Sequence, residues 1–124
     1  MWKIEIPAAT PSGNEAIRMH FRERMRLKET FGWLLISALN KQPKIPAATG
    51  PRTLVIERHG RKAMDLDNLA SGAKGLIDCI REQRLILDDC PELCSMEFKQ
   101  VINKKNGSHT VIYLEDIDSI VENI

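Results

Sequence analysis

The sequence predicts one α+β domain in which helices cover a mixed β-sheet. Two kinds of hydrophobic pattern support this class, because short segments alternate apolar and polar residues while longer segments show the helical repeat. The third observation is an Asn-Gly turn between two short segments, which is typical of a β-hairpin. With 124 residues, 43% of them hydrophobic, the chain is long enough to bury a core. We expect a single small domain over residues 1–124 with the order β-α-β-α-β-β-α.

The first half of the chain is expected to form a strand, a long helix and a second strand. Residues 2–6 alternate apolar and polar side chains, as in a half-buried strand. After a loop that contains two prolines, residues 15–39 show a helical repeat, which Gly32 bends or interrupts. The core stripe of this helix is expected to be Ile17, Phe21, Met25, Phe31, Leu34, Leu35 and Leu39. Residues 53–57 predict a buried strand, and residues 58–64 a polar connector.

A second helix is predicted over residues 68–83. Asp67 or Asn68 is a suitable N-cap, because a side-chain oxygen at that position accepts a hydrogen bond from the first turn. The apolar residues of the segment repeat at helical spacing. They are expected to form one buried face of Leu69, Ala73, Leu76, Ile77 and Ile80.

The chain is expected to end in a hairpin and a short helix. Residues 95–102 and 108–114 alternate like strands, and Asn106-Gly107 is the strongest element of the turn between them. A C-terminal helix over residues 115–121 is expected to pack its apolar side chains on the sheet. These side chains are Ile117, Ile120 and Val121.

Charge is distributed unevenly along a chain whose net charge is only +1. Residues 18–28 carry five cations opposed only by Glu23, and Arg18, Arg22 and Arg26 recur every fourth residue. A second basic group over residues 58–62 leads directly into an acidic cluster. Basic flanks around an acidic centre suit a polyanion that is held over a metal site.

Composition also limits the compartment and the role of the cysteines. No apolar run has the length of a membrane span and no cationic leader precedes one, so we expect an intracellular protein. The three cysteines, Cys79, Cys90 and Cys94, do not have zinc-finger spacing. Cys90 and Cys94 could chelate a metal, but a second cysteine pair is missing. Reduced structural or incidental thiols are the better interpretation.

Two acidic clusters flank the second predicted helix: Asp65-Leu66-Asp67-Asn68-Leu69 precedes it and Leu87-Asp88-Asp89 follows it. Four carboxylates near one helix repel one another unless a cation neutralises them, and Mg²⁺ prefers carboxylate oxygens. In an extended segment, the side chains of Asp65 and Asp67 project to the same side. Asp89 is expected to return to their neighbourhood. The alternative is that Asp67 only caps the helix, Asp65 is solvated and Asp88-Asp89 forms a turn.

Lys74 lies on the polar face of the same predicted helix, where it could meet a scissile phosphate. The alternative is a surface lysine that pairs with Asp78 at i, i+4.

Together these residues resemble a known family of nucleases. The Asp65–Leu69 run, Lys74, Asp78 and Leu87-Asp88-Asp89 are similar to the motif of the RusA family of Holliday junction resolvases. Residues 11–14, Pro-Ser-Gly-Asn, resemble the family's Pro-Ser-x-Asn loop, and a basic helix follows in both. The strand-turn-strand after Asp89 also fits, so the resemblance covers most of the chain. Members of this family are small endonucleases of bacteria, prophages and phages that act as homodimers with Mg²⁺.

The resemblance implies a set of catalytic residues. Asp65, Asp67 and Asp89 would be the carboxylates that bind Mg²⁺, and Lys74 the lysine that assists catalysis. The implied reaction is hydrolysis of a DNA phosphodiester at a four-way junction by a homodimer. The implied setting is the bacterial cytoplasm, with a host or phage gene.

Two departures from the family pattern concern residues next to this set. Aligning Lys74 needs an insertion after Asp67 of close to one helical turn, which keeps the lysine on its face but moves it along the axis. Met64 precedes the first aspartate where relatives can carry a basic residue. Arg61 or Lys62 is expected to substitute for it.

The basic residues are expected to contact DNA phosphates, which position DNA without reading its sequence. These residues are Arg18, Arg22, Arg24, Arg26, Lys28, Arg58, Arg61, Lys62, Lys104 and Lys105. For the run over residues 18–28, the alternative is a solvated helix face.

Two other functions compete with a junction-resolving endonuclease. One is a non-catalytic protein that binds branched DNA, although such a protein has little need to hold carboxylates near phosphates. The other is a Mg²⁺-dependent phosphohydrolase of small nucleotides, which would need a glycine-rich phosphate loop that the sequence lacks.

Overall fold

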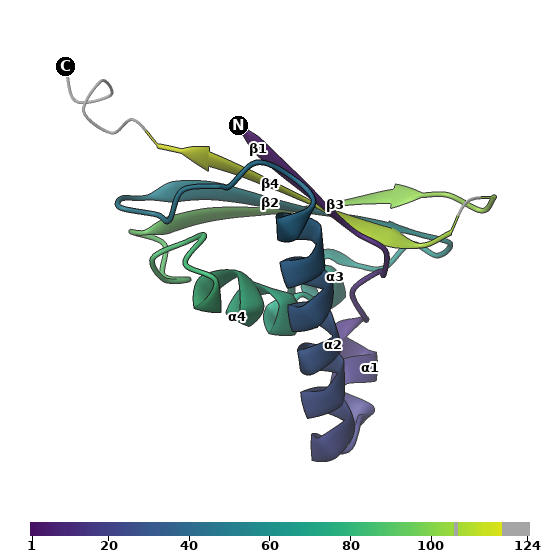
Figure 1. Ribbon diagram of the computed structural model, residues 1–124. Helices are drawn as coiled ribbons and strands as arrows, with labels where there is room; N and C mark the ends of the chain where they lie inside the picture. Colours follow the sequence, from purple (N-terminus) through teal and green to yellow (C-terminus); the bar gives the residue numbers. More distant parts are fainter. Residues whose placement is uncertain (106, 118–124) are drawn as a thin grey trace.

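The computed structural model describes residues 1–105 and 107–117, which form a four-stranded mixed sheet with four helices on one of its faces (Figure 1). This arrangement confirms the predicted α+β class. The strands are β1 (Trp2–Ile6), β2 (Arg52–Gly60), β3 (Cys94–Ile102) and β4 (His109–Asp116). The helices are α1 (Gly13–Arg18), α2 (Phe21–Asn40), α3 (Leu66–Gly72) and α4 (Lys74–Glu82).

The order of the strands in the sheet is β1-β4-β2-β3. Strand β2 lies between β3 and β4, so the prediction that these two strands pair as a hairpin is wrong. Strand β4 is antiparallel to both of its neighbours, whereas β2 and β3 are parallel, with Arg52 opposite Cys94 and Arg58 opposite Gln100. Parallel neighbours need a crossover connection, and α3 and α4 supply it. The crossover therefore runs from the carboxyl end of β2 to the amino end of β3.

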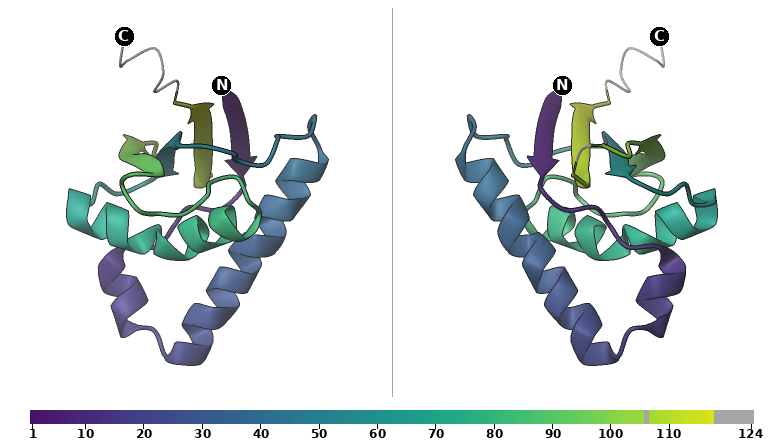
Figure 2. Two further views of the ribbon diagram at one scale, coloured as in Figure 1. Left: turned by 90° about the vertical axis from the view of Figure 1, so that its left-hand side faces the viewer. Right: turned by 90° about the vertical axis from the view of Figure 1, so that its right-hand side faces the viewer.

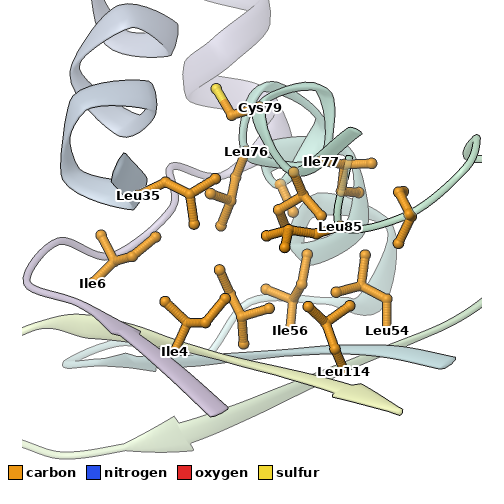
Figure 3. Packing of buried hydrophobic residues seen from close by; sticks show 14 of the residues in the cluster. Ile4, Ile6, Leu35, Leu54, Ile56, Leu76, Ile77, Cys79, Leu85 and Leu114 are labelled. Atoms are coloured by element: carbon orange, nitrogen blue, oxygen red, sulfur yellow. The ribbon is translucent and has the colours of Figure 1, made fainter. Parts of the chain in front are cut away.

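The core lies between the sheet and the helices (Figure 3). Ile4 and Ile6 of β1 are fully buried, which confirms the period-two pattern of the first predicted strand. The predicted apolar face of the second helical segment is also confirmed. All of its members are buried: Leu69, Ala73, Leu76, Ile77 and Ile80.

The first predicted helix is two helices, so the single helix over residues 15–39 is wrong. Helix α1 ends at an extended residue, Met19, and His20 caps α2 by accepting a hydrogen bond from the backbone N of Arg22 through Nδ1 (3.2 Å). The interruption therefore lies there and not at Gly32, which is inside α2. No helix in the described part of the chain is long and apolar enough to cross a membrane.

This interruption also changes the predicted core stripe. Phe31 and Leu35, in the second half of α2, are buried, and Leu34 and Leu39 pack against the core. The predicted core positions Ile17, Phe21 and Met25 are instead 77%, 62% and 55% exposed. The reason is that α1 and the first half of α2 diverge from the sheet toward a tip (Figure 2), beyond the reach of the core.

The second predicted helix is also divided, at Ala73, and it begins earlier than expected. Its N-cap is Asp65, so the prediction of Asp67 or Asn68 is wrong. Strand β2 is longer than predicted, because Arg58 to Gly60 continue its ladder and are not part of a connector.

The predicted C-terminal helix is wrong at its start. Glu115 and Asp116 belong to β4, where they pair with Thr53 and Arg52 of β2. An ion pair between Asp116 and Arg52 (2.8 Å) accompanies this pairing. Ile117 follows β4 in no regular element. The rest of the predicted helix, with Ile120 and Val121, lies outside the described residues, as does Asn106 of the predicted turn.

Two glycines of the crossover give a matched test of this packing. A Cβ on Gly72 would overlap the backbone carbonyl of Pro11, whereas a Cβ on Gly75 would only touch Lys28 at 3.9 Å. Gly72→Ala is therefore expected to destabilise the fold by about 1–3 kcal/mol through overpacking. Gly75→Ala is expected to be neutral or to stabilise it by up to about 1 kcal/mol through helix propensity. Urea unfolding measures both, and equal effects would contradict the close contact at Gly72.

Candidate functional site

The first acidic cluster begins helix α3, close to the carboxyl end of β2. Asp65 Oδ1 accepts a hydrogen bond from the backbone N of Asn68 (2.9 Å), and its Oδ2 accepts one from the Asn68 side chain (3.2 Å). Asp67 lies in the first turn of α3, where the helix dipole favours a negative charge. The two aspartates thus do not share an extended segment. Asp65 is fixed as the cap, whereas the exposed Asp67 carboxylate has no hydrogen-bond or ion-pair partner among the described residues.

A side chain of β3 holds the residue that precedes Asp65. Gln100 Nε2 donates a hydrogen bond to the carbonyl of Met64 (2.7 Å), and the backbone N of Met64 donates one to Gln100 Oε1 (3.0 Å). These two hydrogen bonds resemble the pair of hydrogen bonds that two opposite residues of neighbouring strands exchange. They therefore fix both the position and the orientation of the Met64 backbone. The sequence carries no signal for Gln100, because its partner is a backbone group far along the chain.

Gln100→Leu is expected to release the peptide at Met64. Both hydrogen bonds are lost, which is expected to cost roughly 1–3 kcal/mol of stability and to speed amide hydrogen exchange at Met64. Exchange followed by NMR measures the local effect. Lys99→Leu is the control, since Lys99 is the next residue of β3 and pairs with Glu97 instead (3.9 Å). Unchanged exchange at Met64 in Gln100→Leu would show that something else holds this peptide.

The loop formed by residues 11–14 contacts the acidic cluster directly. The backbone N of Asn14 donates a hydrogen bond to Asn68 Oδ1 (3.1 Å), although the two residues are 54 positions apart. On the other side of the loop, Arg58 Nε of β2 donates to the carbonyl of Thr10 (2.7 Å). The two segments that the sequence marks by their resemblance to one family are therefore neighbours in space.

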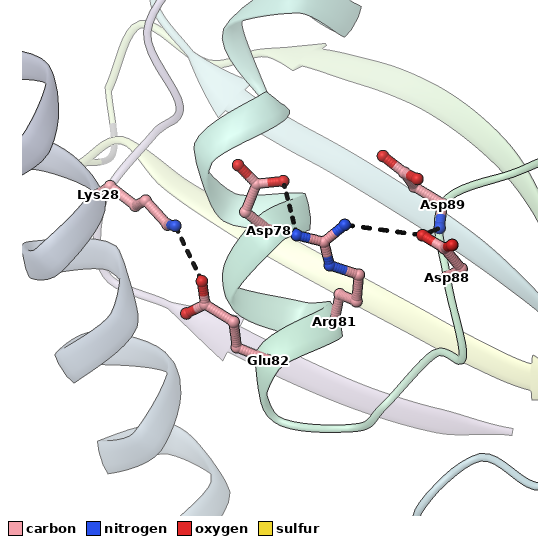
Figure 4. A network of polar contacts seen from close by, with 6 residues as sticks. All are labelled: Lys28, Asp78, Arg81, Glu82, Asp88 and Asp89. Atoms are coloured by element: carbon pink, nitrogen blue, oxygen red, sulfur yellow. Dashed lines mark hydrogen bonds and ion pairs between the residues drawn. The ribbon is translucent and has the colours of Figure 1, made fainter.

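The second acidic cluster lies beside α4 (Figure 4). Arg81 approaches Asp88 at 3.6 Å and Asp78 at 3.9 Å, so it links the cluster to the helix. Asp88 also accepts a hydrogen bond from the backbone N of Asp89 (2.8 Å), and this bond, with the Arg81 charge, lowers the pKa of Asp88. The side chain of Asp89 interacts with that of Asp88, but the exposed Asp89 carboxylate forms no ion pair with a cation among residues 1–105 and 107–117. Asp89 is thus the better available ligand of the two.

The structure does not bring the two acidic clusters together within one chain. Met64, which precedes Asp65, is hydrogen-bonded to Gln100 of β3. At the other end of β3, the backbone N of Cys94 donates a hydrogen bond to the carbonyl of Cys90, which follows Asp89 (2.9 Å). The strand segment between those two anchors spans ~20 Å at about 3.3 Å per residue. Consistent with this separation, the described residues contain no group of three or more His, Cys, Asp or Glu side chains that could hold a metal ion. Asp65, Asp67 and Asp89 therefore do not form such a group within one described chain, and their binding of Mg²⁺ stays a prediction.

Lys74 is the first residue of α4 and its side chain is exposed. The predicted alternative, an ion pair between Lys74 and Asp78, is not found among the described residues. Asp78 instead pairs with Arg81. With a rise of 1.5 Å per residue, Lys74 lies ~10 Å along the crossover from Asp67. It is available for an anion, although it is not in contact with the acidic cluster.

The other predicted cations occupy three places. Arg22, Arg24 and Arg26 are exposed on the first half of α2, and Arg18 ends α1, so the break between the helices interrupts their repeat. Beyond the adjacent carboxyl ends of β2 and β3, where α3 begins, lie the exposed residues Arg61, Lys62, Lys104 and Lys105. Two cations are already bound: Arg58 to Thr10, and Lys28 to Glu82 (2.8 Å).

The cysteines divide by burial. Cys79 and Cys94 are buried and Cys90 is partly exposed, and all three are free thiols. Burial raises the pKa of the Cys79 thiol and raises that of Cys94 to about 11. Both therefore stay protonated and unreactive well above neutral pH. At pH 8 we expect a thiol reagent to modify Cys90 first, as measured by peptide mass spectrometry. Equal modification of all three before urea is added would contradict this order.

In comparisons with known proteins, no protein-family model and no curated protein matches the sequence.

Proposed function

We propose that this chain is a Mg²⁺-dependent endonuclease that resolves four-way DNA junctions by paired nicking, as a homodimer. The observation that carries the proposal is the contact between the Asn14 backbone and the Asn68 side chain. It joins the loop of residues 11–14 to the acidic cluster, so both parts of the motif contribute to one surface. The expected setting is the bacterial cytoplasm, with the gene belonging to the host or to a phage.

The separation of the acidic clusters bears on how a metal would be held. Asp65 and Asp67 lie at one end of the crossover and Asp89 lies near the other, so we propose that a second copy completes the site. Asp65 and Asp67 would then act with Asp89 of the partner subunit. The chemistry expected of such a site is hydrolysis of a phosphodiester by water whose pKa a divalent cation lowers. Two such sites in a two-fold dimer would suit the paired nicks.

The exposed basic residues would bind the phosphates of the DNA. Arg61, Lys62, Lys104 and Lys105 follow the ends of two adjacent strands close to Asp65 and would contact phosphates around it. Lys74 would neutralise charge that develops on the phosphate during cleavage. The arginines at the start of α2 would extend the contact to a second arm of the junction.

The alternative is a protein that binds branched DNA without cutting it. The feature against it is the Asp67 carboxylate, which is exposed next to the proposed phosphate contacts and is repelled by DNA unless a cation lies between them.

The test is incubation of a synthetic four-way junction with the wild-type chain and Mg²⁺, followed by denaturing electrophoresis. A linear duplex of the same sequence is the control substrate, and EDTA is the control for the metal. We expect symmetrical nicks in the junction alone, and only with Mg²⁺. Binding of the junction without nicks would favour the alternative.

A further inference from the structure

An apolar groove lies between α1, the first half of α2 and the junction of α3 with α4. Its volume is about 490 Å³. Its walls include the exposed side chains of Ile17, Phe21 and Met25. In Figure 2, α1 and α2 diverge from their common tip toward the crossover helices. Residues of all these elements line the groove. Exposed apolar side chains that line one groove are typical of a binding site for a ligand or another macromolecule.

Cations line the same groove. Arg24, Lys28 and Lys74 are in its wall and Asp78 is the acidic residue there, while Glu82 engages Lys28 from outside. The lining therefore carries more positive than negative charge around an apolar floor. This combination favours an occupant with both an apolar face and negative charge. It disfavours the apolar surface of a second copy, which would desolvate these cations without pairing them.

The groove adjoins the candidate site. Ser71 and Lys74 belong to its wall, and Ser71 Oγ donates a hydrogen bond to the backbone carbonyl of Asp67 (2.7 Å). A ligand in the groove would therefore lie about one helical turn from Asp67.

We propose that the groove binds a nucleobase that leaves the base stack at the branch point of branched DNA. The base would stack on Phe21 and contact Met25, and its flanking phosphates would meet Arg24 and Lys74. Stacking on aromatic side chains beside cations is how proteins bind single-stranded nucleotides without reading sequence. A base inside a continuous duplex is stacked on both sides, whereas a branch point interrupts the stack, so less free energy is needed to move a base from there into the groove. The inference rests on the proposed function and adds to it a reason for preferring branched DNA.

The test measures DNA binding rather than cleavage, in EDTA, with a fluorescent 2-aminopurine placed at the branch point of a four-way junction. The wild-type chain is expected to bind the junction and to change the fluorescence of the probe. Phe21→Ala is expected to weaken junction binding roughly tenfold and to abolish the fluorescence change. Affinity for a linear duplex is expected to stay the same. Trp33→Ala is the matched control, because Trp33 is 70% exposed on the same helix but outside the groove.

Several outcomes would overturn the inference. They are a wild-type chain that does not bind the junction, Phe21→Ala binding that is unchanged, or an equal loss for junction and duplex. A change of oligomeric state in Phe21→Ala, seen by sedimentation and without loss of junction affinity, would instead assign the groove to contact between copies. Failure of the proposed function is a separate result, namely junction binding without Mg²⁺-dependent nicking.

Discussion

Asp67→Asn is expected to reduce Mg²⁺-dependent cleavage of a four-way junction by at least about 100-fold, since even residues that only support metal ligands cost about 10- to 100-fold. The substitution keeps the shape of the side chain but removes its charge. Asp67 is exposed and makes no contact that the fold needs among the described residues. Stability is therefore expected to change by less than about 1 kcal/mol. Junction affinity in EDTA is expected to stay the same or to rise, because a carboxylate that repels phosphate is lost.

Mixing two inactive variants tests whether two copies share each site. In a mixed dimer of Asp67→Asn with Asp89→Asn, one shared site carries both substitutions and the other carries neither. If Asp65 and Asp67 act with Asp89 of the partner subunit, the mixture recovers about a quarter of wild-type nicking, because about half of the dimers are mixed. If all three aspartates act within one chain, every site in the mixture lacks a carboxylate and no activity returns.

Asp88→Asn is the control for the substitutions of Asp67 and Asp89. Asp88 is engaged by Arg81 and by the backbone of Asp89, so its substitution is expected to leave cleavage within a few-fold of wild type. Asp67→Asn that cleaves as well as wild type would show that the acidic cluster caps α3 and does nothing more.

Much of the fold could be predicted from local patterns, and the errors arise where a local signal is missing or where a long-range contact decides the structure. The alternation of β1 and the apolar face of α4 depend on burial, which the spacing of apolar residues records. The break at Met19 and His20 lacks glycine and proline, the usual signals of a helix end, so the helical repeat continues across it in the sequence. The extension of β4 to Asp116 depends on pairing with Arg52, a contact that no short segment contains.

The candidate site also has features that could be predicted from the sequence and features that could not. The aspartates could be named from the sequence, because their spacing around one helical segment is visible there. Their separation follows from that same segment, since the crossover connects opposite ends of β2 and β3 and holds Asp65 away from Asp89. The support from Gln100 could not be predicted, because it depends on which strand lies beside β2.

Arg52→Met is expected to destabilise the fold by about 3–5 kcal/mol. Arg52 is a charged residue that is only 2% exposed. Its Nη1 donates a hydrogen bond to the carbonyl of Leu85 (2.9 Å), its Nη2 to that of Pro46 (2.8 Å), and its Nε to Asp116 (2.8 Å). The guanidinium also lies over the Trp2 ring, 4.6 Å from its centroid. Methionine fills much of the same space but leaves the two carbonyls without their donor.

Urea unfolding measures this loss, and Lys28→Met is the control. Lys28 also forms an ion pair, with Glu82, but both side chains are about half exposed, so breaking it is expected to cost less than about 1 kcal/mol. A loss in Arg52→Met no larger than in Lys28→Met would show that water replaces the guanidinium at both carbonyls.

The position of Arg52 separates its effect on stability from any effect on the candidate site. Arg52 begins β2, whereas Met64 and Asp65 follow the other end of that strand. Folded Arg52→Met at low temperature is therefore expected to show wild-type amide exchange at Met64 and wild-type affinity for the junction. Gln100→Leu is expected to show the reverse, a smaller loss of stability with fast exchange at Met64. If both substitutions speed exchange at Met64 equally, the acidic cluster is held by the stability of the whole sheet and not by Gln100.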